Sequence, residues 1–152
     1  MTEYVSQLSL GRLAFEVVDN KIIKISFTDK PETNAHYPEP VKLAIDEIDQ
    51  YLRKTRREFS FPYELVAIGF QLEVLSALRN VPYGEKITYK QLAESIGSPR
   101  AFRAVGNACK KNPLPILIPC HRVIKSDGSI GGYAGGEEVK KHLLDLERDD
   151  HR

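Results

Sequence analysis

Apolar and polar positions in the N-terminal part of the chain alternate first with the period of a strand. Residues 13–17 are apolar at every second position, and residues 22–27 form a second, mostly apolar run, both typical of β-strands. Asp19 and Asn20 separate the two runs and are residues that tight turns favour. The pattern predicts a β-hairpin, followed by a loop over the polar, proline-containing residues 30–40.

Residues 41–54 change to a helical period. Their apolar positions fall on one side of a helix and are Val41, Ala44, Ile45, Ile48, Tyr51 and Leu52. Residues 59–62 then predict a short strand that leads into a linker. This half of the chain carries no recognisable group of reactive side chains, so we expect residues 1–62 to form a scaffold domain.

The second half opens with two predicted helices. Apolar residues spaced along 70–81 predict the first, which the Pro-Tyr-Gly sequence at 82–84 ends. Thr88 has the side chain of an N-cap for a second helix over residues 89–96, and Gly97 is placed to end that helix.

A further helix is predicted to run from Ser98, as N-cap, through Pro99, in the first turn, to Lys111. With the preceding helix it has the layout of a helix-turn-helix. The positions expected to be buried are Ala101, Val105 and Ala108. The opposite positions are Arg103, Asn107 and Lys110, with Arg100 and Gly106 nearby. Basic, amide and small side chains let a helix approach a nucleic-acid backbone, although the same helix pair also occurs as a plain packing unit.

The remaining segments complete a second domain. Residues 114–118 are typical of a buried extended run, and residues 123–130 predict a hairpin that would form a wing beside the helix-turn-helix. A glycine-rich loop over 131–136 precedes a last helix over 137–148. We therefore expect an α+β protein whose residues 63–152 form a winged helix-turn-helix domain.

Composition and charge narrow the class of protein. The chain has 41% hydrophobic and 28% charged residues, a balance typical of soluble globular domains. No apolar run is long enough for a membrane helix and no secretory signal is recognisable, so we expect no membrane association and a cytoplasmic location, or a nuclear one in a eukaryote. The net charge is +1, but residues 97–126 contain six Lys or Arg residues and no Asp or Glu. This local excess suits a surface that faces a polyanion, although an ordinary solvated face would look the same.

The chain contains two cysteines, Cys109 and Cys120. A structural disulfide is not expected in a reducing compartment, and the cysteines and histidines lack the spacing of a zinc site, so we expect no metal and no cofactor. Cys120 is followed by His121 and Arg122, and a neighbouring imidazole or cation lowers the pKa of a thiol. Adjacency in sequence does not establish contact, however, and a buried cysteine is commonly an inert apolar residue.

Several ordered motifs in this half resemble one family. Residues 119–123 (PCHRV), preceded by 112–118 (NPLPILI), resemble the active-site signature of the O6-alkylguanine-DNA alkyltransferases, also called methylated-DNA–protein-cysteine methyltransferases. The resemblance covers residues 70–147 and includes 81–84 (VPYG), 87–93 (ITYKQLA), 103–106 (RAVG) and 132–136 (GYAGG). It implies direct DNA repair by a C-terminal winged helix-turn-helix domain and a ribonuclease-H-like topology for the N-terminal domain.

The resemblance assigns a nucleophile and the groups that activate it. Cys120 would accept an alkyl group from O6-alkylguanine, with O4-alkylthymine as a further candidate substrate. His121, acting through a water, would be the base that generates the thiolate, and Glu147 would orient His121. Asn112 would hold the turn before the active-site segment. The product would be a thioether that nothing in the sequence could reverse, so each molecule would act once.

The resemblance also assigns contacts with double-stranded DNA containing alkylated guanine, bound by a monomer. Tyr89 would press on a phosphate while the nucleotide rotates out of the duplex, and it would donate a proton to the guanine ring. Arg103 would fill the vacated space in the base stack. Further DNA contacts are expected from Arg100, Asn107, Lys110 and Arg122. The substrate pocket is expected to be lined by Pro115, Val123, Tyr133 and Ala134.

Two positions depart from the family pattern. Ala134 stands where some relatives have Ser, so only its backbone amide can serve there. Cys109 stands on the recognition helix where relatives often carry a larger apolar side chain. We expect Cys109 to have a packing role, with a second reactive thiol as the alternative.

Three other functions remain as alternatives. An alkyltransferase-like damage binder replaces the acceptor cysteine, typically with tryptophan, whereas this chain has Cys120 and no Trp. A winged-helix regulator that reads DNA sequence would leave the conjunction of Cys120, His121, Tyr89 and Glu147 unexplained. A thiol hydrolase would need an oxyanion hole that the sequence does not indicate.

Overall fold

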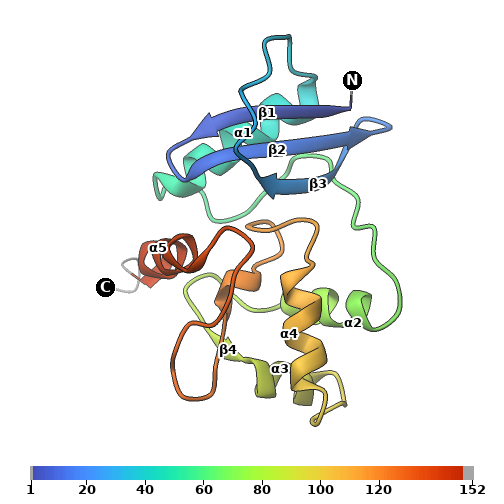
Figure 1. Ribbon diagram of the computed structural model, residues 1–152, viewed down its shortest axis with the longest axis vertical. Helices are drawn as coiled ribbons and strands as arrows, with labels where there is room; N and C mark the ends of the chain where they lie inside the picture. Colours follow the sequence, from blue (N-terminus) through green and yellow to red (C-terminus); the bar gives the residue numbers. More distant parts are fainter. Residues whose placement is uncertain (1, 149–152) are drawn as a thin grey trace. The chain divides into compact units, whose positions relative to one another are not determined.

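The computed structural model describes residues 2–148, which divide into two compact units between Val66 and Ala67. The first unit holds a three-stranded sheet and one helix, and the second holds the other helices and a two-stranded sheet (Figure 1). This mixture of helices and small sheets agrees with the broad α+β expectation. None of the described helices is long and apolar enough to cross a membrane.

The sheet of the first unit is antiparallel, in the order β1 (Glu3–Leu8), β2 (Gly11–Val18), β3 (Lys21–Phe27). The predicted hairpin is confirmed as β2 and β3. Asp19 and Asn20 join these strands with φ values of 50° and 65°, the left-handed conformation that short hairpin turns require. Strand β1 was not predicted, because its mixed residues show no clean alternation.

Helix α1 (Glu39–Leu52) covers one face of this sheet (Figure 1). It buries Val41, Ala44, Ile48 and Tyr51, which confirms the helical face predicted from the sequence. The helix begins slightly earlier than expected because Pro40 fits the first turn, where no backbone N–H is needed.

The strand predicted over residues 59–62 is wrong. The chain makes only an isolated parallel bridge between Ile22 and Tyr63. The buried carboxylate of Glu47 accepts the backbone N–H groups of Ser60 at 2.7 Å and Phe61 at 3.1 Å. Two main-chain donors that a strand would use are therefore bound by a side chain of α1.

The second unit begins with α2 (Gly69–Leu78), α3 (Tyr89–Ser95) and α4 (Phe102–Lys110). Thr88 caps α3 as predicted, accepting the N–H of Gln91 while the Gln91 side chain accepts the N–H of Thr88. The prediction that Ser98 caps the next helix is wrong. The Ser98 carbonyl accepts the N–H of Ala101 at 2.9 Å, so residues 98–101 form a separate turn and α4 starts at Phe102.

Two segments after α4 differ from the prediction. Residues 114–118 are largely buried as expected but are not extended, because Ile116 has φ 76° and the chain folds back so that Ile118 donates to the Leu114 carbonyl. The wing hairpin is also wrong. Strand β5 (Val123–Ile124) pairs in parallel with β4 (Ile87–Thr88), and residues 129–130 form no strand.

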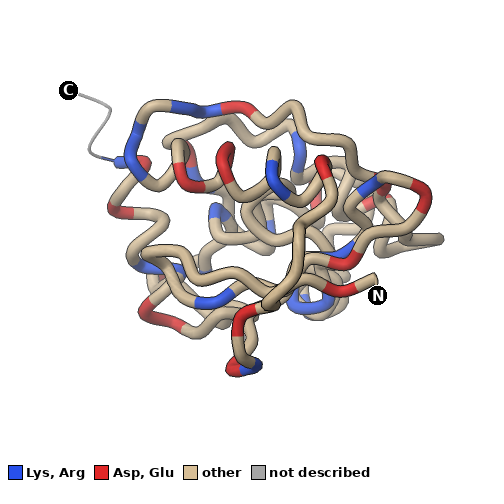
Figure 2. Tube along the Cα trace, turned by 90° about the horizontal axis from the view of Figure 1, so that it is seen from above, with Lys and Arg blue, Asp and Glu red and all other residues tan. Residues whose placement is uncertain are grey.

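The last helix, α5 (Glu137–Arg148), has the predicted bounds. It buries Lys140, Leu143, Leu146 and Glu147, so one inward face carries both apolar and charged side chains. Basic and acidic positions are interspersed along the backbone trace, as the net charge of +1 leads one to expect (Figure 2).

Candidate active site

Cys120 opens a single 3-10 turn, η1 (Cys120–Arg122), and is only 5% exposed. The turn is held in place by Asn112, whose side-chain amide donates to the Ile118 carbonyl at 2.8 Å and whose oxygen accepts the N–H of Leu114 at 2.9 Å. Since Asn112 is itself buried, the loop that delivers the thiol is fixed from inside by two hydrogen bonds.

The thiol borders a cavity of about 480 Å³, large enough for a nucleobase with its substituent. Helix α4 forms one wall and the glycine-rich loop after β5 forms another. The lining residues are Tyr89, Arg103, Gly106, Asn107, Cys109, Lys110, Cys120, Lys125, Gly132 and Tyr133.

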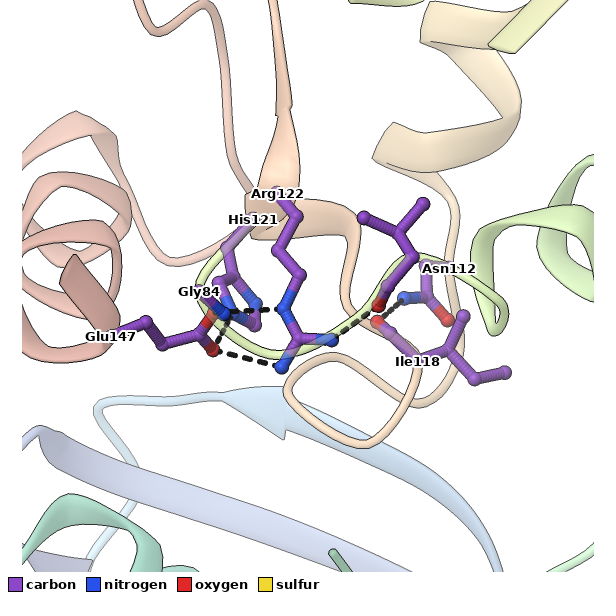
Figure 3. A network of polar contacts seen from close by, with 7 residues as sticks. Gly84, Asn112, Ile118, His121, Arg122 and Glu147 are labelled. Atoms are coloured by element: carbon purple, nitrogen blue, oxygen red, sulfur yellow. Dashed lines mark hydrogen bonds and ion pairs between the residues drawn. The ribbon is translucent and has the colours of Figure 1, made fainter. Parts of the chain in front are cut away.

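The two residues that follow Cys120, His121 and Arg122, belong to a polar network centred on Glu147 of α5 (Figure 3). Its carboxylate accepts a 2.7 Å hydrogen bond from Nε2 of His121 and two from Arg122, at 2.8 and 3.0 Å. The backbone N–H of Gly84 donates to the same carboxylate at 3.1 Å, and Arg122 also donates to the Val81 carbonyl at 2.7 Å.

This network fixes the protonation of its members. Burial would raise the pKa of Glu147, but the hydrogen bonds and charges of His121 and Arg122 outweigh it and hold that pKa well below its usual range. Burial lowers the pKa of His121, against the opposing effect of Glu147. His121 is therefore a neutral imidazole whose Nε2–H is bound to a carboxylate, which leaves Nδ1 as the basic nitrogen.

The thiol itself needs such a base. Burial raises the pKa of Cys120 to about 11, although Asn112 and the Lys140 charge act in the opposite direction. Near neutral pH the group is a thiol, and its proton must be removed before sulfur can attack. Burial, together with Cys120, raises the pKa of Cys109 to about 12, so this second thiol in the cavity is still harder to ionise.

Lys140 is a functional candidate that the sequence analysis missed. It is fully buried on α5, and its ammonium donates to the Gly132 carbonyl at 3.2 Å and to the Tyr89 hydroxyl at 3.4 Å. The sequence spacing could have identified Lys140 as inward-facing, because it precedes Leu143 by three residues and Glu147 by seven. These spacings place the three side chains on one face of α5. A charged residue on an apolar helix face is costly unless it has partners, and here its partners belong to the cavity.

Tyr89 is placed by close contact with glycines. A Cβ on Gly131 would lie 3.0 Å from the Tyr89 hydroxyl, and one on Gly106 would lie 3.8 Å from its ring. Gly131 also has φ 75°, a conformation that side chains rarely adopt. Burial and the two thiols raise the pKa of Tyr89 to about 12, so its hydroxyl keeps its proton near neutral pH.

The predicted DNA-contact residues separate into two groups. Arg103, Asn107 and Lys110 are exposed on α4 and line the cavity, and Arg100 is exposed in the turn before that helix. Arg122 is instead only 8% exposed and its guanidinium is bound to Glu147. The structure therefore contradicts a phosphate contact for Arg122 and gives it a positioning role within the network.

Of the four residues predicted to line the substrate pocket, one lines the cavity and three do not. Tyr133 lines the cavity together with Lys125, a basic residue that the sequence analysis did not single out. Pro115 and Val123 are buried and Ala134 is exposed, and none of the three is among the residues that line the cavity.

Comparisons with known proteins identify the family of this chain. The model of the family described as "6-O-methylguanine DNA methyltransferase, DNA binding domain" matches residues 69–149. The constitutive methylated-DNA–protein-cysteine methyltransferase of Bacillus subtilis is 37% identical over 153 residues, covering 94% of this chain and 93% of that protein. The enzyme of that name from Methanosarcina barkeri is 54% identical over 95 residues, covering 61% of this chain and 60% of its own.

A solved structure also has a fold similar to that of this chain. The crystal structure of Mycobacterium tuberculosis OGT in complex with DNA superposes with a TM-score of 0.84 and 34% sequence identity, covering 97% of this chain and 93% of that one. The family expected from the sequence motifs is thus confirmed by a family model, by curated relatives and by a solved structure. The chain belongs to the methylated-DNA–protein-cysteine methyltransferase family.

Proposed function

We propose that this protein repairs DNA by direct reversal, moving an alkyl group from O6-alkylguanine onto Cys120. The observation that carries the proposal is the chain of groups from Glu147 through His121 to a thiol that borders the cavity, with 2.7 Å between the carboxylate and the imidazole. An orienting acid, a neutral imidazole and a nucleophile in this order are the parts of an activated nucleophile.

The transfer begins with the thiol proton. His121, through a bridging water, accepts the proton of Cys120, and Glu147 stabilises the imidazolium that forms. The thiolate then attacks the alkyl carbon from the side opposite the guanine oxygen. A carbon–sulfur bond forms as the carbon–oxygen bond breaks, and the electron pair of the broken bond passes to the guanine ring.

The guanine that loses the alkyl group carries a negative charge, so its ring has to receive a proton. Tyr89 keeps its proton at neutral pH and faces the cavity, so it is placed to donate that proton to the ring. Lys140 then stabilises the phenolate through the contact with the Tyr89 hydroxyl. The imidazolium of His121 returns its proton through solvent to the Tyr89 phenolate, so that both side chains are neutral again and neutral guanine stays in the DNA.

The protein acts once. A thioether at Cys120 is not cleaved by any nucleophile among the described residues of the site, so the alkyl group stays on the sulfur. All residues of the site lie within residues 81–147 of one chain, so a monomer suffices. Transfer from O4-alkylthymine is a second expected reaction, and direct competition between the two lesions in one mixture will rank them.

The lesion reaches Cys120 by rotating out of the duplex, since the thiol is 5% exposed and borders a cavity. Arg103, exposed on α4 at the edge of this cavity, is placed to enter the base stack. Arg103→Ala should slow repair of a paired lesion while transfer from the free base O6-methylguanine continues. Equal losses on both substrates would remove the role of Arg103 in flipping.

The test of the function is the intact mass of the protein after mixing with a duplex that contains one O6-methylguanine. The expected result is a gain of one CH2 unit, mapped to Cys120 and saturating at one per molecule. Cys120→Ser should gain nothing and Cys109→Ser should gain the same unit. Reduced, DNA-binding protein that gains no mass would favour a damage binder or a regulator instead.

A further inference from the structure

A second cavity, of about 360 Å³, adjoins the one at Cys120. It is lined by Tyr89, Lys90, Phe102, Arg103, Gly106, Lys125 and Ser126. Tyr89, Arg103, Gly106 and Lys125 line both cavities, so the two are separated only by shared side chains. The reaction proposed above uses the first cavity and leaves the second without a role.

The distinctive residue of the second cavity is Phe102. It is the first residue of α4 and is 47% exposed, whereas the other exposed residues of that helix are polar or small. Among the described residues Phe102 has no aromatic partner. An exposed ring that borders a cavity offers a face on which another planar group can stack.

Cations line the same cavity as this ring. Lys90, Arg103 and Lys125 line the cavity and are exposed, and the cavity lining contains no Asp or Glu. An aromatic face among basic side chains is the combination that binds nucleotides of an unpaired strand, with the base on the ring and the phosphate on the cations. The charge of the lining is thus complementary to the DNA backbone.

We propose that this second cavity binds the nucleobase adjacent to the alkylated guanine on the same strand, stacked on Phe102. This inference rests on the proposed function, because it requires the alkylated guanine to occupy the cavity at Cys120. Consecutive nucleotides of one strand are joined by a single phosphate, so a base in the first cavity places its neighbour at the adjoining one. Lys90 and Lys125 are positioned to bind the connecting phosphates.

The experiment uses single-stranded oligonucleotides that contain O6-methylguanine, with the neighbouring nucleotide on either side kept or replaced by an abasic analogue. The rate of methyl transfer is measured at limiting concentration, and transfer from the free base O6-methylguanine reports the chemical step. For the unaltered protein, one of the two abasic replacements should slow transfer by about tenfold, the order of magnitude of one base–aromatic stacking contact. Phe102→Ala should lose that dependence on the neighbouring base, and Phe102→Trp should keep it.

Leu72→Ala is the matched control, because Leu72 is an apolar side chain of α2 that is 39% exposed and lines neither cavity. It should keep the full dependence on the neighbouring base. Two results would overturn the inference: no dependence on either neighbour in the unaltered protein, or a Phe102→Ala loss confined to duplexes, which would make Phe102 a wedge between paired bases. Failure of the proposed function is distinguishable, since transfer from the free base would then be absent as well.

Discussion

Each unit of the protein buries one glutamate to 1% exposure, and the donors around the two carboxylates differ. Glu47 accepts from the backbone N–H groups of Ser60 and Phe61 and from the Ser60 hydroxyl, and the Arg56 guanidinium forms an ion pair with it at 3.8 Å. Glu147 accepts mainly from the side chains of His121 and Arg122. Burial of a carboxylate therefore does not mark a reactive site by itself, and the identity of its donors decides what it can do.

The consequence follows from the chemistry of the donors. None of the groups that donate to Glu47 is a base that could activate a nucleophile, so Glu47 holds the loop at residues 60–61 against α1. An imidazole has a second nitrogen, so a carboxylate bound to one side changes the basicity of the other. In the proposed reaction Glu147 acts on the thiol in this way, through His121.

The largest difference between the two carboxylates should appear when each glutamate is replaced by glutamine. Glu147→Gln should lower the rate of methyl transfer by about a hundredfold or more, since it weakens the base that activates Cys120. It should also destabilise the protein by about 3–5 kcal/mol, because Arg122 keeps its charge in a buried place without a counter-charge. Both values are obtained from single-turnover rates and from urea unfolding.

Glu47→Gln is the matched variant. It should cost about 1–3 kcal/mol through weakened hydrogen bonds to the loop, with the transfer rate unchanged when measured where the protein is folded. A Glu47→Gln protein that is folded but slow would contradict the division between a structural and a reactive carboxylate.

The next largest effect is expected at Lys140. Lys140→Met removes a buried cation that lowers the pKa of Cys120, so the thiol becomes harder to ionise and transfer should slow by about tenfold. Stability should change little, because the lost contacts are offset by removal of a desolvated charge. The pH dependence of Cys120 alkylation by iodoacetamide should shift to higher pH. Lys141→Met, an exposed neighbour on α5, should leave that profile in place.

Lys140 also shows where sequence analysis stops. Hydrophobic period and caps were enough to predict α1, α3 and α5, because these signals are local. The burial of Lys140 was not predicted, since the loop that covers it through the Gly132 carbonyl has no periodic pattern. Glu147 was found through the family motif alone.

The errors have the same origin. Strands predicted at residues 59–62 and 129–130 have suitable composition, but Glu47 binds the N–H groups of the first and a parallel partner, β4, takes the place of the second. Arg122 was grouped with DNA-contact residues because it is basic and lies beside Cys120. Its partner, Glu147, is 25 residues away along the chain, and only the folded structure brings the two together.

Acid should weaken the reactive network around Glu147. Since burial lowers the pKa of His121 below 6.5, the unfolded chain binds that proton first, and the free energy of unfolding falls as the pH drops below that value. Glu147 has a pKa held well below its ordinary 4.5, so the loss continues as the pH falls through that region. Urea unfolding at a series of pH values measures both steps. His121→Asn should remove the upper step, whereas His142→Asn, exposed on α5, should keep it.

The smallest expected effect concerns an exposed residue of α4 and not the buried network around Glu147. Lys110 is exposed and lines the cavity, so a phosphate contact there would release one counterion when DNA binds. Lys110→Gln should weaken DNA binding and reduce the slope of log Kd against log salt by about one. Lys24→Gln removes the same charge from an exposed position of β3 that lines no part of the cavity, and its slope should equal that of the unaltered protein.

If the two variants have the same slope, Lys110 is merely solvated. The interface with DNA would then be limited to side chains closer to Arg103, while the reaction at Cys120 would still proceed through Glu147 and His121.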